Sequence, residues 1–428
     1  MIERTTSTAV IDAAGRVNRR SFVRTIAAGT AGLAGLSWRD QVLAQAPALK
    51  KQGKSVILLW MQGGPSQFET FDPKTKSDVK GEVNAISTAA DGIQISEFFP
   101  NVAKQMKDIS FIRTVTNKEG AHPRATYQLH TGYLPSGAIK HPTFGSLIAK
   151  ELGPDDFDLP SFVSVLGPSE GQGFLPVKYA PFRVGDAARM PANVEAAVKG
   201  ERFERRLRLM NDLDQTYAKT GSAALVENHL GLYESAARLV KSPRLAAFDI
   251  SKESAKTQER YGNSAFGKGC LLARRLVETG VTFVEVQLGN WDTHDDNHNR
   301  SKNLAGQCDP AFAALVADLK ERGRLENTLV IWMGEFGRTP RINPRGGRDH
   351  FPRAFSVALA GSGVKGGRIV GKTTEDGQNV ADRPVAVPDL FCTFTHALGV
   401  NPAKENQSSI GRPIKIVDGG SPVRELFA

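Results

Sequence analysis

Cysteine is scarce in this 428-residue sequence, which contains only Cys270, Cys308 and Cys392. Their number is odd, and their wide spacing is not that of a thiolate metal site. This excludes a zinc finger or a comparable cysteine cluster. Either one disulfide or three buried free thiols fits the sequence.

Long apolar runs are also missing. The most apolar N-terminal segment, Ile26 to Leu36, is too short and too weakly hydrophobic to span a bilayer, and no second candidate follows. We therefore expect no permanent membrane span. A formal net charge of +10 favours anionic ligands in general. Because no long basic run and no nucleic-acid-binding module is recognisable, we expect no nucleic acid partner.

The N-terminal residues have the pattern of an export signal. Arg19 and Arg20 are followed by Ser21-Phe22, an apolar glycine- and alanine-rich segment, and the small residues Ala44-Gln45-Ala46. We predict a twin-arginine signal peptide over residues 1–46, although Pro47 would hinder cleavage directly after Ala46. The protein is then periplasmic or otherwise exported, folds before transport, and has the twin-arginine translocase as a partner. The alternative is an ordinary amphipathic N-terminal helix.

The remaining chain alternates apolar runs with helical patterns, which is typical of parallel strands joined by crossover helices. The predicted strands are Ser55 to Met61, Ile109 to Arg113, Ser161 to Val165, Val281 to Val286, Thr328 to Met333 and Phe355 to Ala360, and a helix is predicted from Pro310 to Arg322. We predict one α/β domain over residues 47–428. A loop and a charged helical segment form an insertion at about 170–260.

Polar residues follow several of these strands, at the edge where parallel sheets bind ligands. Glycines around Glu335 let the chain turn sharply after one strand, and a loop rich in aspartate and histidine follows another. The candidate metal ligands are Asp292, His294, His298, Glu335, Asp349 and His350. Carboxylates and neutral imidazoles bind divalent ions, so we expect zinc, manganese or calcium.

Anion-binding candidates lie in the same loops. Ser66 follows a glycine pair, and Arg338 and Arg348 lie in the loop between Glu335 and His350. Together with Arg124, these arginines could bind a phosphate or sulfate group through bidentate hydrogen bonds. The alternatives are a simple turn at Ser66 and solvated or paired arginines.

Four motifs together resemble the bacterial family called domain of unknown function 1501. They are Gly63-Gly64-Pro65-Ser66, Trp291-Asp292-Thr293-His294, Gly334 to Pro340 and Gly347-Arg348-Asp349-His350. The resemblance covers essentially the whole mature chain. The family is similar to the alkaline phosphatase superfamily, which includes sulfatases and cofactor-independent phosphoglycerate mutases. The resemblance implies a mostly parallel central sheet flanked by helices on both faces, with two metals at its carboxyl edge.

The match to that superfamily is partial. Its members often end a strand in Asp-His-Gly, whereas this chain has Glu335-Phe336-Gly337. Gln62 stands where a metal-binding aspartate is expected, and Asp72, further along the loop, is a candidate substitute. One metal site is therefore predicted to be intact and the second to be altered.

The segment from His122 to Gly132 resembles the sulfatase signature, and the resemblance puts His122 at the place of the nucleophile. A residue before proline is disfavoured in the α conformation, and proline suits the first helical turn. We therefore expect His122 to cap a helix whose amino end attracts anions. It is either a nucleophile, a general acid or a metal ligand, or a capping residue that only orders the loop.

Two functional hypotheses follow. In the first, the protein is an exported metal-dependent hydrolase of phosphate or sulfate esters, acting on an anionic small molecule or polysaccharide. Asp292, His294 and His350 hold the metal, Glu335 binds a second ion or acts as a base, and His122 or a metal-bound water attacks. In the second, a catalytically degenerate relative binds an anionic envelope or polysaccharide ligand without turnover.

Overall fold

The computed structural model describes residues 53–75, 78–192, 194–196, 198, 200–219, 221 and 223–428. The predicted signal peptide, residues 1–46, lies outside the described residues. None of the helices in the described part of the chain combines the length and the apolar character that crossing a membrane requires.

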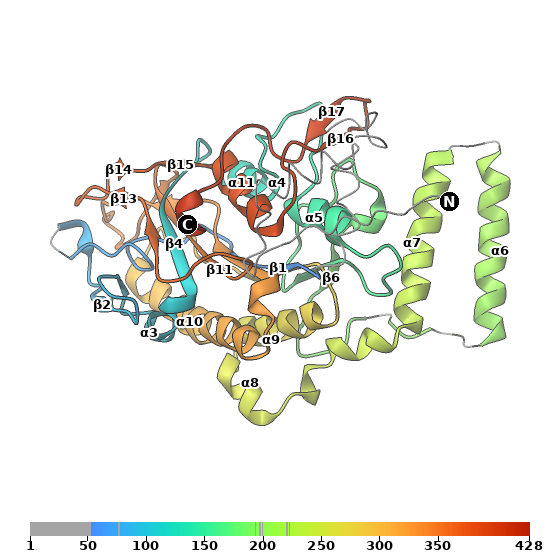
Figure 1. The fold of residues 1–428 in the computed structure, drawn as a ribbon, viewed down its shortest axis with the longest axis horizontal. Helices are drawn as coiled ribbons and strands as arrows, with labels where there is room; N and C mark the ends of the chain where they lie inside the picture. The colour runs from blue at the N-terminus through green and yellow to red at the C-terminus, as the bar shows by residue number, and fades with distance from the viewer. Residues whose placement is uncertain are drawn as a thin grey trace, which may run out of the picture. The chain divides into compact units, whose positions relative to one another are not determined.

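A mixed, mostly parallel sheet forms the centre of the described chain (Figure 1). Its strands are β1 (Ser55–Met61), β4 (Ile109–Thr116), β5 (Phe162–Val165), β6 (Phe182–Val184), β7 (Phe283–Leu288), β8 (Thr328–Met333), β11 (Phe355–Ala360), β12 (Ile369–Val370) and β15 (Val385–Ala386). The order is β12-β4-β11-β8-β1-β7-β5-β6, and β15 also pairs with β4. Strand β11 runs antiparallel to both neighbours, and the other pairings are parallel.

Helices cover both faces of this sheet, with α9 and α10 on one face and α5 and α11 on the other (Figure 1). The helices are α3 (Pro100–Lys104), α4 (His122–Thr131), α5 (Phe144–Leu152), α6 (Glu201–Ala218), α7 (Ala223–Lys241), α8 (Ala255–Tyr261), α9 (Ala265–Glu278), α10 (Asn297–Glu321) and α11 (Val387–Leu398). Four small ribbons pair β2 (Ala85–Ser87) with β3 (Gln94–Ser96), β9 (Gly337–Arg338) with β10 (His350–Phe351), β13 (Lys372–Thr373) with β14 (Val380–Asp382), and β16 (Glu405–Gln407) with β17 (Pro413–Lys415). The predicted α/β class is confirmed.

The central strands of this sheet are mostly apolar because they are buried on both faces. Every residue of β1, β7 and β8 is buried, as parallel strands covered by helices require. On one face the fully buried Trp332 packs edge-on against Phe71, with 4.7 Å between ring centroids. Its indole N–H donates to the Cys308 sulfur at 3.2 Å. All three cysteines are free and buried, so the free-thiol alternative holds in the structure.

The predicted start of a helix at Pro310 is wrong. Helix α10 begins at Asn297 and contains Pro310 in its interior. Leu304 and Cys308 before the proline and Phe312 after it are all buried. A proline inside a helix costs about 3 kcal/mol, and burial of apolar side chains on both sides of it offsets that amount.

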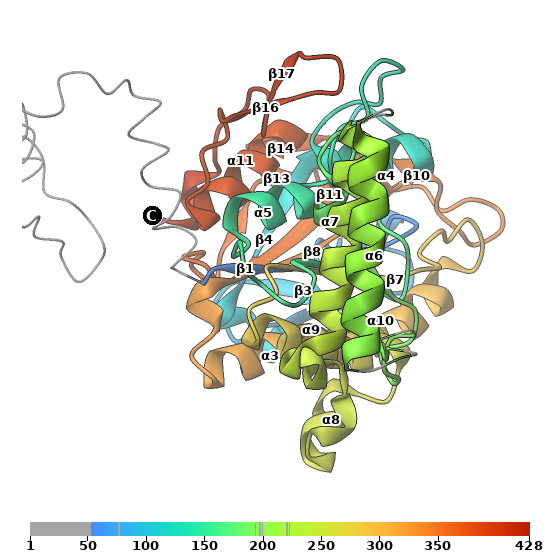
Figure 2. The ribbon, with the colours of Figure 1, turned by 90° about the vertical axis from the view of Figure 1, so that its right-hand side faces the viewer.

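The region predicted as an insertion, about residues 170–260, contains β6, the long helices α6 and α7, and nearly all of α8. Helix α7 lies beside the main body, and α6 packs on the outer side of α7 (Figures 1 and 2). The pair forms an antiparallel helical hairpin.

A buried ion pair between His130 and Glu285 connects α4 to β7 of the sheet. His130 Nε2 lies 3.2 Å from Glu285 Oε1 on β7, and His130 Nδ1 donates to the Thr126 carbonyl at 2.8 Å. Burial lowers the pKa of His130, but the charge and hydrogen bond of Glu285 outweigh burial and raise it overall. The ring also packs edge-on against Trp60 at 4.2 Å between centroids. This contact fixes the helix that begins with His122.

We predict that Glu285→Leu lowers the free energy of unfolding by about 3–5 kcal/mol, because it leaves His130 buried without its carboxylate. The double variant His130→Leu with Glu285→Leu removes both polar groups and should lose much less. Urea denaturation of the parent chain, the two single variants Glu285→Leu and His130→Leu, and the double variant measures these values. A double variant as unstable as the sum of the two single variants would show that the pair is not coupled.

Candidate metal centre

Four loops meet at the carboxyl edge of the sheet. They follow β1, β4, β7 and β8, which all end at this edge because they run parallel. The loop after β1 touches the loop after β7 so closely that a Cβ added to Gly63 would lie 2.4 Å from the Asp292 nitrogen. Gly63 also has a φ of +111°, which side chains rarely adopt. Glycine is therefore required where the first and third loops cross.

Three imidazoles and one carboxylate converge at this edge. The Nε2 atoms of His122, His294 and His350 lie 3.3, 3.1 and 3.3 Å from Asp292 Oδ1. These histidine side chains are 30%, 32% and 26% exposed, so the cluster is open to solvent on one side. Imidazole nitrogens and carboxylates are common ligands of transition-metal ions, and ligand atoms of His122, Asp292 and His350 lie within 4.8 Å of one another, so these three residues form a possible metal site beside His294.

Two of these imidazoles form a hydrogen bond with a carboxylate through Nδ1, the ring nitrogen that points away from Asp292. His122 Nδ1 lies 2.6 Å from Glu335 Oε1, and His294 Nδ1 lies 2.8 Å from Asp349 Oδ1. A carboxylate accepts hydrogen bonds, so each Nδ1 carries a proton. In the neutral imidazole the lone pair is then on Nε2, the atom that faces Asp292.

A main-chain carbonyl holds the third imidazole. His350 Nδ1 donates to the Gly120 carbonyl at 2.8 Å, which again leaves the lone pair on Nε2. Such outer partners of metal-binding histidines fix both the tautomer and the ring orientation. All three histidines therefore present Nε2 lone pairs to one region of space.

Two of the imidazoles are close enough to share a proton or a cation. His294 Nε2 and His350 Nε2 are 2.9 Å apart, and two lone pairs at that distance repel unless a proton or a cation lies between them. His122 Nε2 is buried and makes no hydrogen bond with the described residues. A bound divalent cation would satisfy all three nitrogens, so these residues fit a metal ion.

Arg338 fixes the carboxylate of the cluster. Its guanidinium is fully buried and donates to Asp292 Oδ1 at 2.7 Å, to the Gly64 carbonyl at 2.9 Å, and to the carbonyls of Gly63 and Trp291. Burial raises the pKa of Asp292, but the hydrogen bond and charge of Arg338 outweigh burial and lower the pKa to about 2. Asp292 is therefore ionised at any physiological pH.

Two of the histidines differ in proton affinity. The hydrogen bond that His122 donates to Glu335 raises the pKa of His122, although burial opposes it. Burial lowers the pKa of His350, and nearby positive charges add to that effect. At neutral pH, His350 is therefore more often neutral than His122, with the lone pair of its Nε2 atom available to a metal ion.

Glu335 lies behind the cluster. Its side chain is fully buried, and Oε1 accepts from the Gly63 nitrogen at 2.9 Å as well as from His122. Asp349 likewise contacts His294 and not the centre of the cluster. The structure thus places both predicted ligands next to imidazoles that face the centre.

Other predicted residues lie away from the centre. His298 lies in α10, where its ring packs edge-on against Phe98 at 5.2 Å between centroids. Asp72 accepts from Thr373 and pairs with Lys74, so it does not stand in for the aspartate missing at Gln62.

The four anion-binding candidates differ in accessibility. Arg338 and Arg348 are fully buried, and Arg348 pairs with Glu69. Arg124 is exposed and forms two hydrogen bonds with Glu119. The Ser66 hydroxyl is buried and has no hydrogen-bond partner among the described residues.

Sequence reasoning missed two features of the centre. The Gly120 carbonyl carries no signal in the sequence, because every residue has a carbonyl. Phe336 lies against two of the imidazoles, with ring centroids 4.8 Å from His122 and 4.5 Å from His350. The only indication in the sequence was its position between Glu335 and Gly337.

The predicted cap is also shifted by one residue, because Ala121 is the N-cap and His122 is the first residue of α4.

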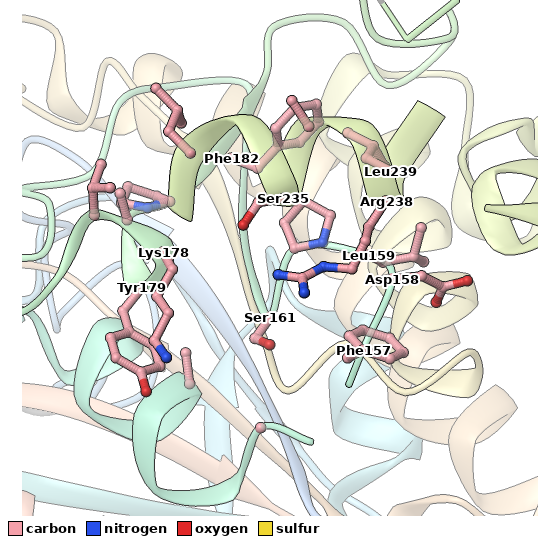
Figure 3. A pocket seen from close by; sticks show the side chains of 18 of the residues that line it. Phe157, Asp158, Leu159, Ser161, Lys178, Tyr179, Phe182, Ser235, Arg238 and Leu239 are labelled. Atoms are coloured by element: carbon pink, nitrogen blue, oxygen red, sulfur yellow. The ribbon is translucent and has the colours of Figure 1, made fainter. Parts of the chain in front are cut away.

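A cavity of about 350 Å³ lies at the opposite edge of the sheet (Figure 3). Its lining includes Leu159 and Ser161 before β5, Phe182 at the start of β6, and Leu239 of α7. Because these segments precede the strands, the cavity is at the amino edge and is separate from the candidate metal centre.

The fold and the site define an α/β protein with a histidine–carboxylate cluster at the carboxyl edge of a mostly parallel sheet. Residues 53–427 match the family described as "Protein of unknown function (DUF1501)", and the chain belongs to this family. No curated protein sequence matches the chain.

Several solved structures are similar at low identity. The PsFucS1 sulfatase from Pseudoalteromonas sp. is 16% identical, with a TM-score of 0.39, and the match covers 84% of this chain and 71% of that chain. The lipoteichoic acid synthase LtaP from Listeria monocytogenes is 9% identical, with a TM-score of 0.37 and coverage of 88% and 80%. The phosphonate monoester hydrolase of Agrobacterium radiobacter is 12% identical, with a TM-score of 0.35 and coverage of 87% and 77%.

We predict that the imidazoles of the chelator-treated protein titrate in a fixed order. His122 should titrate above about pH 6.5, the ordinary value for histidine, and His350 below it. His350 should also show the Nδ1–H tautomer, because Gly120 accepts that proton. Nitrogen-15 NMR of the imidazoles measures both, with His350→Gln used for assignment. The reverse order, or an Nε2–H tautomer at His350, would contradict this geometry.

Proposed function

We propose that the chain is a metal-dependent hydrolase of phosphate or sulfate esters that uses one divalent ion held by His122, Asp292, His294 and His350. The observation that carries this proposal is the convergence of three Nε2 atoms on Asp292, with each Nδ1 atom already committed to an acceptor. When bound, such an ion polarises an ester oxygen and makes water a better nucleophile at neutral pH.

The ligand set narrows the choice of ion. Imidazole suits zinc, copper, iron and nickel, whereas calcium takes an all-oxygen set of six to eight ligands. Three histidines and one aspartate therefore favour zinc or a similar transition-metal ion over calcium. Manganese, which prefers carboxylate and water ligands, is a weaker candidate than zinc.

The surrounding residues have positioning roles in this proposal. Glu335 Oε1 holds the Nδ1 proton of His122, and Asp349 Oδ1 holds that of His294. Arg338 keeps Asp292 ionised and fixes the direction of its Oδ1 atom. Glu335 accepts the Nδ1 proton of His122, and in this proposal the ion takes Nε2, so we assign this residue as a ligand and not as the nucleophile.

The proposal includes export. A twin-arginine signal over residues 1–46 would bring the chain to the periplasm through the twin-arginine translocase, which carries folded proteins. Such a route lets a metal be acquired before transport. An anionic ester, as a small molecule or within a polysaccharide, would then be the substrate outside the cytoplasm. The domain boundary at residue 47 belongs to the same proposal.

One observation favours the second candidate function, binding of an anionic ligand without turnover. Arg338 and Arg348 are buried in contacts within the protein, and Arg124 is paired with Glu119. Few of the predicted cations are therefore free to stabilise the transition state of a phosphate or sulfate ester. A metal-loaded protein that binds such esters but does not cleave them would establish this alternative.

We predict that the purified chain binds one transition-metal ion and that Asp292→Ala, His294→Ala or His350→Ala abolishes stoichiometric binding. The matched control His298→Ala, outside the cluster, should retain the ion. Elemental mass spectrometry measures the content, and hydrolysis of p-nitrophenyl phosphate and sulfate measures activity on the same samples. Chelation should remove the activity, and zinc should restore it.

Three results of this experiment are informative. No ion after purification with zinc supplied would refute the metal-centre proposal. An ion retained in all three cluster variants would place the site elsewhere. A bound ion without hydrolysis of any phosphate or sulfate ester would refute the hydrolase and support the binding protein.

We predict that the increase in Tm caused by zinc grows from about pH 6 to about pH 8. Without metal, the raised pKa of His122 means that its charged form stabilises the fold. That contribution is complete below the unfolded pKa of about 6.5 and is lost as pH rises through the folded pKa. Zinc requires the deprotonated Nε2 atom, so its binding gains as the proton leaves.

Differential scanning fluorimetry with and without zinc measures this shift. His350→Ala is the control and should show little zinc-dependent shift at any pH. A shift that is constant with pH, or largest under acidic conditions, would contradict the assignment of His122 as a ligand.

A further inference from the structure

The cavity at the amino edge of the sheet has the dimensions of a small-molecule site. Its volume of about 350 Å³ falls within the range of about 300–1,000 Å³ that is typical of ligand pockets. Leu159 and Phe182 line it from the α/β body, and Leu239 lines it from α7. Leu159 and Leu239 are buried, so the inner wall of the cavity is apolar. A ligand here would contact both the body and the helical hairpin.

Aromatic side chains form much of the remaining wall. Phe157, Tyr179 and Phe182 are half-buried and lie on different sides of the cavity (Figure 3). The Phe182 ring packs edge-on against Phe248, with 6.0 Å between centroids, and the Arg244 guanidinium lies 5.7 Å from the centroid of the Phe157 ring. These contacts hold two of the rings in place. Because aromatic rings attract one another edge-to-face or offset, the walls favour a ligand that contains an aromatic ring.

Arg238 points into this cavity from α7 (Figure 3). Its guanidinium forms no hydrogen bond or ion pair within the described part of the chain. Arg238 lies in the last turn of α7, where a cation also interacts favourably with the helix dipole. That interaction does not require the guanidinium to face the cavity. A guanidinium directed into an apolar pocket is suited to bind the carboxylate of a ligand through two parallel hydrogen bonds.

The charges around the cavity favour an anion. Asp158 accepts a hydrogen bond from Arg244 at 2.6 Å, so the charge of this lining carboxylate is balanced. Asp155 is exposed, and solvent screens its charge. Lys178 adds a second positive charge to the lining beside Arg238. The cavity therefore has a positive potential.

Two hydroxyl groups lie near the guanidinium, which is between Ser235 and Ser161 in the view of Figure 3. The Ser235 hydroxyl donates to the Gly231 carbonyl at 2.7 Å. The Ser161 hydroxyl has no hydrogen-bond partner among the residues that the structure describes. Ser161 can therefore donate its proton to an anion that Arg238 binds.

We propose that this cavity binds an aromatic carboxylate. The ring of the ligand lies among Phe157, Tyr179 and Phe182, and its carboxylate accepts hydrogen bonds from Arg238 and Ser161. A carboxylate has one charge and two oxygens in a plane, which a single guanidinium satisfies. A phosphate group carries about two charges and three acceptor oxygens, and it would need further donors. This site lies at the opposite edge of the sheet from the candidate metal centre and does not depend on the proposed hydrolase activity.

Equilibrium dialysis of the full chain against naphthoate tests the proposal. We expect saturable binding, and we expect Arg238→Leu to raise the dissociation constant by at least about tenfold, because it removes a charged hydrogen-bond donor. Arg208→Leu is the matched control, because Arg208 is an exposed arginine of α6 outside the cavity lining. Naphthamide, the neutral analogue, should bind the parent chain more weakly, and Arg238→Leu should change its dissociation constant much less.

Two further variants locate the site. Ser235→Trp fills the cavity and should abolish binding of both probes, whereas His350→Ala, at the candidate metal centre, should retain naphthoate binding. Circular dichroism shows whether each variant is folded. Absence of naphthoate binding at millimolar concentration, or equal affinity of Arg238→Leu and Arg208→Leu, would overturn the proposal. So would loss of naphthoate binding in His350→Ala with retention in Arg238→Leu, and octanoate binding more tightly than naphthoate would overturn the aromatic class of the ligand.

Discussion

The hydrogen bonds of the buried Arg338 guanidinium are the interaction on which the candidate metal centre depends. Arg338 follows β8, yet it donates to carbonyls in the loops after β1 and β7 and to the Asp292 carboxylate. A fully buried cation is tolerated only where its donors are satisfied and a counter-charge is near. Both conditions are met only when all three loops take their observed positions. One side chain therefore couples the geometry of three strand ends.

The glycines of these loops are part of the same constraint. A Cβ at Gly64 would lie 2.7 Å from the Phe336 ring, and one at Gly337 would lie 2.4 Å from the Gln67 amide oxygen. Side chains at these positions would push the loops apart and lengthen the hydrogen bonds of Arg338. The close approach of the loop backbones, the buried Arg338 guanidinium and the Asp292 carboxylate that it orients thus form one cooperative unit. The imidazoles are then oriented from outside this unit, by Glu335, Asp349 and the Gly120 carbonyl.

Sequence alone predicted the strands and their common edge well, because a short apolar run that ends in polar residues is typical of a buried strand in an α/β fold. It did not distinguish residues that face the centre from those behind them. Glu335 and Asp292 both follow a buried strand, and only the fold shows that Glu335 turns toward His122, 213 positions away in the chain. A local sequence pattern shows at which strand end a residue lies, but it does not show in which direction its side chain points. The predicted helix start at Pro310 was wrong for a related reason, since burial of apolar side chains along α10 outweighed the local preference of proline for the first helical turn.

Phe336 bears on how many ions the centre can hold. The resemblance to the superfamily implies a histidine at this position and an aspartate at the position of Gln62. In this chain the Phe336 ring instead packs against His122 and His350, where it offers no lone pair. Glu335, the carboxylate beside it, is occupied by His122 and the Gly63 nitrogen. In the proposed centre, Glu335 and Phe336 thus support His122 and His350 and are not free to bind a second ion. A hydrolase built on this centre would use one ion both to activate the nucleophile and to stabilise the developing charge. Its activity would therefore depend on how well its four ligands are oriented.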